Sequence, residues 1–240
     1  MKNTRIGIIL FLTTFLIIGC GSDGSNENPV NTETEFNFFP PGFFVAGYRE
    51  EFNFTGTRQR TDTNEQTDTF TNNSVIITQP EGVYNLTSVI PILDIGEIGF
   101  DDGTSTPVSV TENYTITDSD RRLIGSVTIL FGITTTTTAT SITAIPKTVK
   151  IGDSGEVGRY IDNFGSVIVI SWDIEEAGNN QAQLRWTTST LNAADNSTLA
   201  VREDISIIDI NGNRLSKSIR VEFFNLTPNL LDNWVGTKVP

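Results

Sequence analysis

Apolar and polar residues alternate along most of this chain. The alternation is clear in residues 52–54, 108–116, 182–186, 199–207 and 215–223. Successive side chains of a β-strand point to opposite faces, so a period of two indicates antiparallel strands with one buried face. Almost no window has the period of a helix. The sequence therefore predicts an all-β fold.

The order of strands and turns is typical of a meander. Residues 164–224 are predicted to form four long strands. Asp102-Gly103, Gly178-Asn179-Asn180 and Asn211-Gly212 supply residues that tolerate positive φ in hairpin turns. Residues 167–172 are apolar on both faces, as in a central strand. We expect an antiparallel meander that forms either a two-sheet sandwich or one strongly curled sheet, a partly open barrel.

Residues 226–235 are the exception to the strand pattern. Pro228 suits the first position of a helix, and Gly236 suits its end. The residues that would share one helix face are Leu226, Leu230, Leu231 and Trp234. A short C-terminal helix is predicted there.

The first nineteen residues have the composition of a secretory signal peptide. Lys2 and Arg5 precede an apolar run at residues 6–18, and Gly19 stands before Cys20, the single cysteine. The apolar run is too short to cross a bilayer as a helix. We expect residues 1–19 to be removed after export.

The tetrad Ile17-Ile18-Gly19-Cys20 resembles the lipobox of bacterial lipoproteins. That resemblance implies cleavage after Gly19 and a diacylglycerol on the thiol of Cys20, so that membrane lipid is the expected partner. A plain signal peptide with a chance cysteine is the alternative. The sorting rule of the family places a lipoprotein with Gly21, rather than aspartate, after the cysteine in the outer membrane, on its periplasmic face or at the cell surface.

The remaining boundaries follow from composition. Residues 21–35 contain glycine, serine, asparagine and acidic residues, with Val30 as the single larger aliphatic residue. Such a segment buries too little surface to offset its ordering entropy. We expect residues 20–35 to be a lipidated cysteine with a flexible tether, and residues 36–240 to be a single all-β domain. Residues 145–155 and the strands after them resemble uncharacterised all-β lipoproteins of Gram-negative bacteria.

Charge and composition exclude several kinds of function. The formal net charge is −13, and removing Lys2 and Arg5 with the signal peptide makes the chain more acidic. A polyanion is repelled by phosphate backbones, so nucleic acid is not an expected partner. Histidine is absent and Cys20 would be acylated, which removes the common catalytic triads and zinc ligands. We expect no enzyme activity, no cofactor and no metal site.

Several motifs that carry chemistry elsewhere have simpler interpretations here. Gly152, Gly155 and Gly158 are spaced like a phosphate-binding loop, but no helix follows them. Residues 209–213 fit a hairpin turn better than a calcium loop. Adjacent carboxylates such as Glu203-Asp204 point to opposite faces of a strand and do not share a site locally. Whether the acidic loops bind calcium, and whether carboxylates meet across strands, is left open.

Aromatic residues support two further alternatives. The segment 36–44 contains Phe36, Phe38, Phe39, Phe43 and Phe44, which either close the core at a sheet edge or form an exposed binding surface. Trp172, Trp186 and Trp234 are either core residues or a stacking platform for sugars or lipids. Trp172 and Trp186 lie on neighbouring predicted strands and are expected to meet across a hairpin.

These observations favour a lipid-anchored envelope protein with a non-catalytic structural, adhesive or binding role. The alternative is a periplasmic carrier for an apolar ligand such as a lipid, held in a curled sheet with the segment 36–44 as a lid. A carbohydrate-binding module is the third hypothesis.

Overall fold

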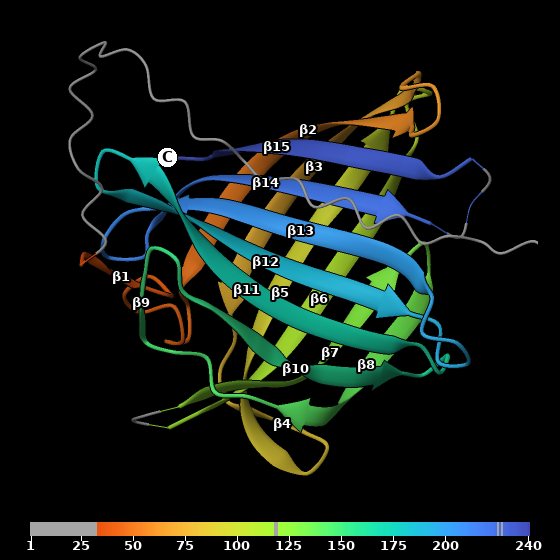
Figure 1. Ribbon diagram of the computed structural model, residues 1–240. Helices are drawn as coiled ribbons and strands as arrows, with labels where there is room; N and C mark the ends of the chain where they lie inside the picture. Colours follow the sequence, from red (N-terminus) through yellow and green to blue (C-terminus); the bar gives the residue numbers. More distant parts are fainter. Residues whose placement is uncertain (1–32, 118–119, 225, 227) are drawn as a thin grey trace, which may run out of the picture. The chain divides into compact units, whose positions relative to one another are not determined.

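The computed structural model describes residues 33–117, 120–224, 226 and 228–240 (Figure 1). All of them belong to the unit Asn31–Pro240. The predicted signal peptide, with Gly19 and Cys20, lies outside the described residues. Within the described part of the chain, no helix is long and apolar enough to cross a membrane.

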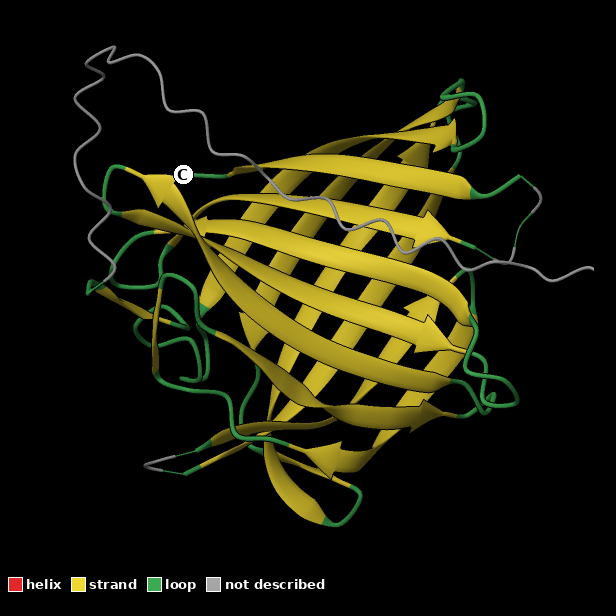
Figure 2. Cartoon of the chain, viewed as in Figure 1, coloured by secondary structure: helices red, strands yellow, loops and turns green. Residues whose placement is uncertain are grey.

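Twelve strands form one closed antiparallel barrel (Figures 1 and 2). In barrel order they are β2 (Arg49–Arg60), β3 (Gln66–Thr78), β5 (Thr87–Phe100), β6 (Ser105–Ile116), β7 (Arg121–Leu130), β8 (Ile133–Ile142), β10 (Ser154–Asp162), β11 (Val167–Gly178), β12 (Gln181–Leu191), β13 (Thr198–Ile208), β14 (Arg214–Phe223) and β15 (Leu230–Lys238). The predicted all-β meander is confirmed.

Of the two predicted forms of that meander, the two-sheet sandwich is wrong; one strongly curled sheet is confirmed, but the barrel it forms is closed and not partly open. The barrel is closed because β15 pairs with β2, from Leu230 opposite Arg60 to Lys238 opposite Phe52. Closure gives the backbone groups of the first and last barrel strands a partner, which an open sheet would leave unpaired. A barrel with this many strands is wide enough to enclose a lumen.

The predicted C-terminal helix is also wrong, because Leu230–Lys238 is strand β15. The strand pairs with β14 on one side and with β2 on the other. Trp234 packs inside against Phe70, with ring centroids 5.1 Å apart, whereas Val235 is exposed. The pairing available on both sides therefore overrides the helical spacing of the leucines.

The predicted hairpin turns are confirmed. Gly103 has φ of 81°, Gly212 has φ of 78°, and Asn179 and Asn180 have φ of 52° and 58°. These are left-handed conformations that glycine and asparagine adopt at low cost.

One end of the barrel is closed by the segment that precedes β2. Strand β1 (Glu35–Asn37) pairs with β9 (Thr148–Lys150) in a small second sheet, at the left end in Figure 1. We call residues 36–48 the aromatic plug. Its Phe36, Phe38 and Phe43 are buried in the core, as expected if the segment closes the core. Strand β1 begins at Glu35, the last residue of the predicted tether.

Backbone hydrogen bonds hold the aromatic plug to the barrel wall. The amide of Asn37 donates to the carbonyl oxygen of Ile210 over 3.1 Å, and the amide of Gly47 donates to Thr78 over 2.9 Å. In return, the amide of Thr78 donates to the carbonyl oxygen of Tyr48. The plug is therefore continuous with the structure of the barrel end.

Close packing against the inner wall leads to a prediction about Gly56 in β2. A Cβ atom at this position would lie 2.6 Å from two carbon atoms of the Trp234 ring. We expect Gly56→Ala to lower the free energy of unfolding by about 1–3 kcal/mol, because the indole ring and its neighbours must shift. Urea denaturation followed by tryptophan fluorescence measures this change.

The matched control is Gly82→Ala in β4 (Gly82–Tyr84), where the nearest atom to a new Cβ is 3.6 Å away. That variant should be close to wild type. Equal stability of the two variants would contradict the packing of Trp234 described above.

Candidate ligand cavity

The barrel encloses a cavity of about 340 Å³. Its walls are inward-facing side chains of the barrel strands, and residues Phe38, Phe39 and Phe43 of the aromatic plug line it as well. This volume lies within the range of about 300–1,000 Å³ that is typical of small-molecule sites. Part of the interior is therefore hollow.

One part of the cavity wall is aromatic. Phe38 of the plug makes edge contacts with Trp172 and Trp186, with ring centroids 5.2 Å and 6.1 Å apart. Phe39 contacts Tyr114 in the same way at 6.2 Å. Trp172 and Trp186 are direct partners in the pairing of β11 with β12, as the sequence predicted. The plug therefore serves as a wall of the cavity.

A second part of the wall is charged. Arg202 and Asp204 alternate on β13 and share its inward face. The Nε and Nη2 atoms of Arg202 donate to the two carboxylate oxygens of Asp204 over 2.6 Å and 2.9 Å. Lys217 of β14 lies 3.4 Å from the same carboxylate. We call Arg202, Asp204 and Lys217 the cationic cluster.

The charges of Arg202 and Asp204 shift each other's pKa values. Burial alone would raise the pKa of Asp204, but Arg202 and Lys217 hold it well below its usual range. The neighbouring carboxylate raises the pKa of Arg202. The side chain of Arg202 nevertheless keeps 41% of its surface exposed while pointing inward, because it faces the hollow.

Two acids lie on the wall formed by β5 and β6. Burial raises the pKa of Glu112, although the hydroxyl of Tyr114 donates a hydrogen bond of 2.8 Å to its carboxylate. Asp94 accepts a hydrogen bond of 2.6 Å from Ser74. The negative charges of Asp94 and Glu112 both raise the pKa of Arg202. These two acids therefore interact electrostatically with the cationic cluster.

A buried ion network fastens the plug to the barrel. Glu50 accepts hydrogen bonds from Nη1 of Arg214 at 2.5 Å and from Nζ of Lys238 at 3.0 Å. The guanidinium of Arg214 also lies over the ring of Phe43, 4.8 Å from its centroid. Arg214 therefore links the wall of the barrel to the aromatic plug.

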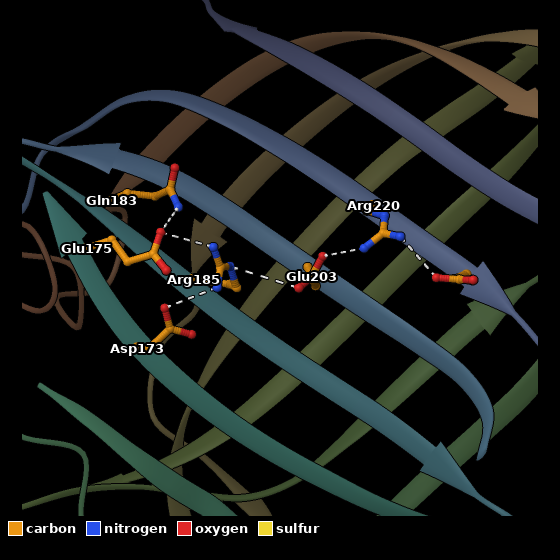
Figure 3. A network of polar contacts seen from close by, with 7 residues as sticks. Asp173, Glu175, Gln183, Arg185, Glu203 and Arg220 are labelled. Carbon is orange, nitrogen blue, oxygen red and sulfur yellow. Dashed lines mark hydrogen bonds and ion pairs between the residues drawn. The ribbon is translucent and has the colours of Figure 1, made fainter. Parts of the chain in front are cut away.

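The barrel exterior carries its own polar network over β11 to β14 (Figure 3). Arg185 lies 3.4 Å from Asp173, 3.1 Å from Glu175 and 3.9 Å from Glu203, and Arg220 lies 3.2 Å from Glu203. Exposed pairs of this kind add little stability. Their position shows that the outer face of these strands carries charged side chains.

The other candidate motifs serve turns, bulges and strands. Gly152 lies in a turn with φ of 92°, and Gly158 follows a bulge in β10. The carboxylate of Asp209 accepts hydrogen bonds from the amides of Asn211 and Asn213 within a hairpin turn. In the described residues, no group of three or more acidic, histidine or cysteine side chains is placed to hold a metal ion.

Sequence reasoning did not identify the cationic cluster, although β13 contains a signal for it. Alternation predicted that Val201, Ile205 and Ile207 face the core. They share the outer face with Glu203, which belongs to the exterior network. The strand was predicted correctly, but its two faces are reversed. The signal is the alternation of Arg202, Asp204 and Ser206, which line the lumen.

Comparison of the chain with protein-family models, with curated proteins and with solved structures found no match.

The buried network around Glu50 leads to a prediction about acid stability. Burial opposes its ionisation, but Arg214 and Lys238 lower the pKa of Glu50 below its ordinary value. A group with a lowered pKa adds stability above the unfolded-state pKa of about 4.3, and this stability is lost as the pH falls through the folded-state value. We expect Glu50→Gln to cost about 3–5 kcal/mol at neutral pH, because Arg214 loses its buried partner.

The difference between Glu50→Gln and wild type should shrink as the pH falls below about 4.3. Urea denaturation across pH measures it. The control is Glu51→Gln, since Glu51 is the next residue, is partly exposed and pairs with Arg49. That change should cost no more than about 1 kcal/mol. A pH-independent difference for Glu50→Gln would argue against the ion network.

Proposed function

We propose that this protein is a lipid-anchored envelope protein that binds an amphipathic small molecule inside its barrel without catalysis. The observation that supports this proposal most directly is the cavity, whose wall is aromatic in one part and charged in another. The cavity favours the carrier hypothesis over a purely structural or adhesive role, because aromatic, apolar and a few charged side chains converge on it, as they do in small-molecule sites. Trp172 is buried, and Trp186 and Trp234 pack against the core, which gives less support to a sugar platform.

Charged residues on the outer face of the barrel support the proposal that the barrel lies in the aqueous phase. Arg185, Glu203 and Arg220 lie on the outer face of the central strands. Charged side chains on a lipid-facing barrel wall are costly. In this proposal the acyl group on Cys20 holds the protein at the outer membrane, while the barrel projects into the aqueous phase.

The anchor is tested by Cys20→Ser in the full chain. Without the thiol there is no site for the diacylglycerol, so the protein should move from the membrane fraction to the soluble fraction after cell lysis. Ser22→Ala, which changes a residue of the predicted tether, should leave it in the membrane fraction. A Cys20→Ser protein from which residues 1–19 have been removed, and which still stays with the membrane in the presence of high salt, would contradict the lipobox interpretation.

Ligand binding is tested by filling the cavity. Thr188 of β12 lines the cavity, and its neighbour Thr187 points to the opposite face of the strand. We expect Thr188→Phe to weaken the binding of an apolar fluorescent probe such as 1-N-phenylnaphthylamine at least tenfold, because the added ring occupies the hollow. Thr187→Phe adds the same ring to the outside and should leave binding unchanged.

The measurement is a fluorescence titration of the protein purified with Cys20→Ser, with native mass spectrometry as a second readout for ligands that copurify. Equal affinities of the two phenylalanine variants would place the probe outside the barrel. If the protein without these phenylalanine substitutions binds neither the probe nor any copurifying molecule, the structural or adhesive role is favoured over ligand binding.

A further inference from the structure

The cationic cluster contains more positive than negative charge. Arg202 and Lys217 share one carboxylate, that of Asp204. Arg214, the third cation of the cavity wall, is engaged with Glu50. One positive charge of the cluster therefore lacks a counter-charge within the cluster itself.

The geometry of Arg202 leaves part of its guanidinium for a ligand. Its Nε and Nη2 atoms donate to Asp204, which leaves Nη1 as the nitrogen not engaged with that carboxylate. The exposed surface of this side chain lies inside the barrel, where a ligand of the lumen would reach it. Arginine has the donor geometry that suits planar and tetrahedral oxyanions.

The two acidic residues across the lumen, Glu112 and Asp94, each accept a hydrogen bond from a neighbouring hydroxyl group. Tyr114 donates to Glu112, and Ser74 donates to Asp94. Burial raises the pKa of Glu112 and the hydrogen bond from Tyr114 lowers it, and the carboxylates of Glu112 and Asp94 both act electrostatically on Arg202. In the described structure Arg202 and Lys217 form their ion pairs with Asp204, so Asp94 and Glu112 act on the cationic cluster from across the lumen without pairing with it.

An apolar surface adjoins the cluster. Trp186 is the direct cross-strand partner of Asp204, so both side chains lie next to each other on the inner face. Trp186 in turn contacts Phe38 of the aromatic plug. A ligand with its head at Arg202 would place its remaining atoms along these rings.

We infer that the ligand is a single-chain amphipath with one negative charge in its headgroup, bound with that head at Arg202 and Lys217 and its alkyl chain along Trp186 and the aromatic plug. This inference rests on the proposed function and narrows its ligand class. A carboxylate head and a tetrahedral head, such as a phosphodiester or sulfate, share the chemistry that the cluster recognises.

The experiment compares ligands with one chain and different heads. Decanoate, decyl sulfate, decan-1-ol and decyltrimethylammonium are titrated into the full barrel with Cys20→Ser, with tryptophan fluorescence as the readout. The three charged compounds stay below their critical micelle concentrations and decan-1-ol below its solubility limit. We expect decanoate or decyl sulfate to bind about tenfold or more tightly than decan-1-ol, because a charge-assisted hydrogen bond distinguishes them. The order of the two anions identifies the head shape. The cation should bind weakest.

Two variants change the net charge of the cationic cluster in opposite directions. Arg202→Gln should bring the affinity for the anions down to that for decan-1-ol and leave the alcohol unaffected. Asp204→Asn should raise the affinity for the anions, because both cations lose their internal partner; a gain in affinity does not arise from misfolding. Arg220→Gln, which removes an arginine from the outer face, is the matched control and should change nothing.

The outcomes separate this inference from the proposed function. Equal binding of decanoate, decyl sulfate and decan-1-ol, or tighter binding of the cation, would overturn the anionic head while leaving a ligand-binding cavity. A fall in affinity for all ligands in Arg202→Gln, with no gain in Asp204→Asn, would do the same. Absence of binding by any of the four compounds and by the apolar probe would overturn both.

Discussion

The pairing of β15 with β2 is the constraint on which the other features depend. It joins the last strand of the sheet to the first over their whole common length. Without it, the same strands form a curled sheet whose interior is open to water along one side. With it, the inward faces of twelve strands surround a lumen, and Arg202 and Asp204 become neighbours within an enclosed space. Closure therefore gives the two alternating faces of each strand different surroundings, one facing the lumen and the other facing outward.

The aromatic plug adds to the apolar part of the cavity wall. The charged part of that wall lies on β13 and β14, with Arg202, Asp204 and Lys217. Phe38 and Phe39 bring rings to one end, where they meet Trp186 and Tyr114. The ion network of Arg214 and Glu50 fixes the plug from the other side. The aromatic plug thus extends an apolar wall to which barrel residues such as Ile170, Leu184 and Trp186 also contribute.

Strands and turns could be predicted from the sequence because their signals are local. The period of two placed β11 to β14, and glycine and asparagine marked the turns at Gly103 and Gly212. Closure could not be predicted, because the residues of β2 and β15 look the same whether or not they pair. The C-terminal helix was wrong for the same reason, since pairing on both sides of β15 outweighed local spacing. The cluster around Arg202 was missed because alternation alone does not tell which face of a strand is inside when the inside is polar.

The pairing that closes the barrel has a consequence for how the chain folds. Neighbouring strands of the barrel are also neighbours in sequence, so most of the sheet grows by hairpins with small loop-closure entropy. Arg60 and Leu230, in contrast, meet across most of the chain. Contacts of such large sequence separation are slow to form, and β15 is made last during synthesis. Until then the growing sheet keeps two unpaired edges. These edges are lost only when β15 pairs with β2.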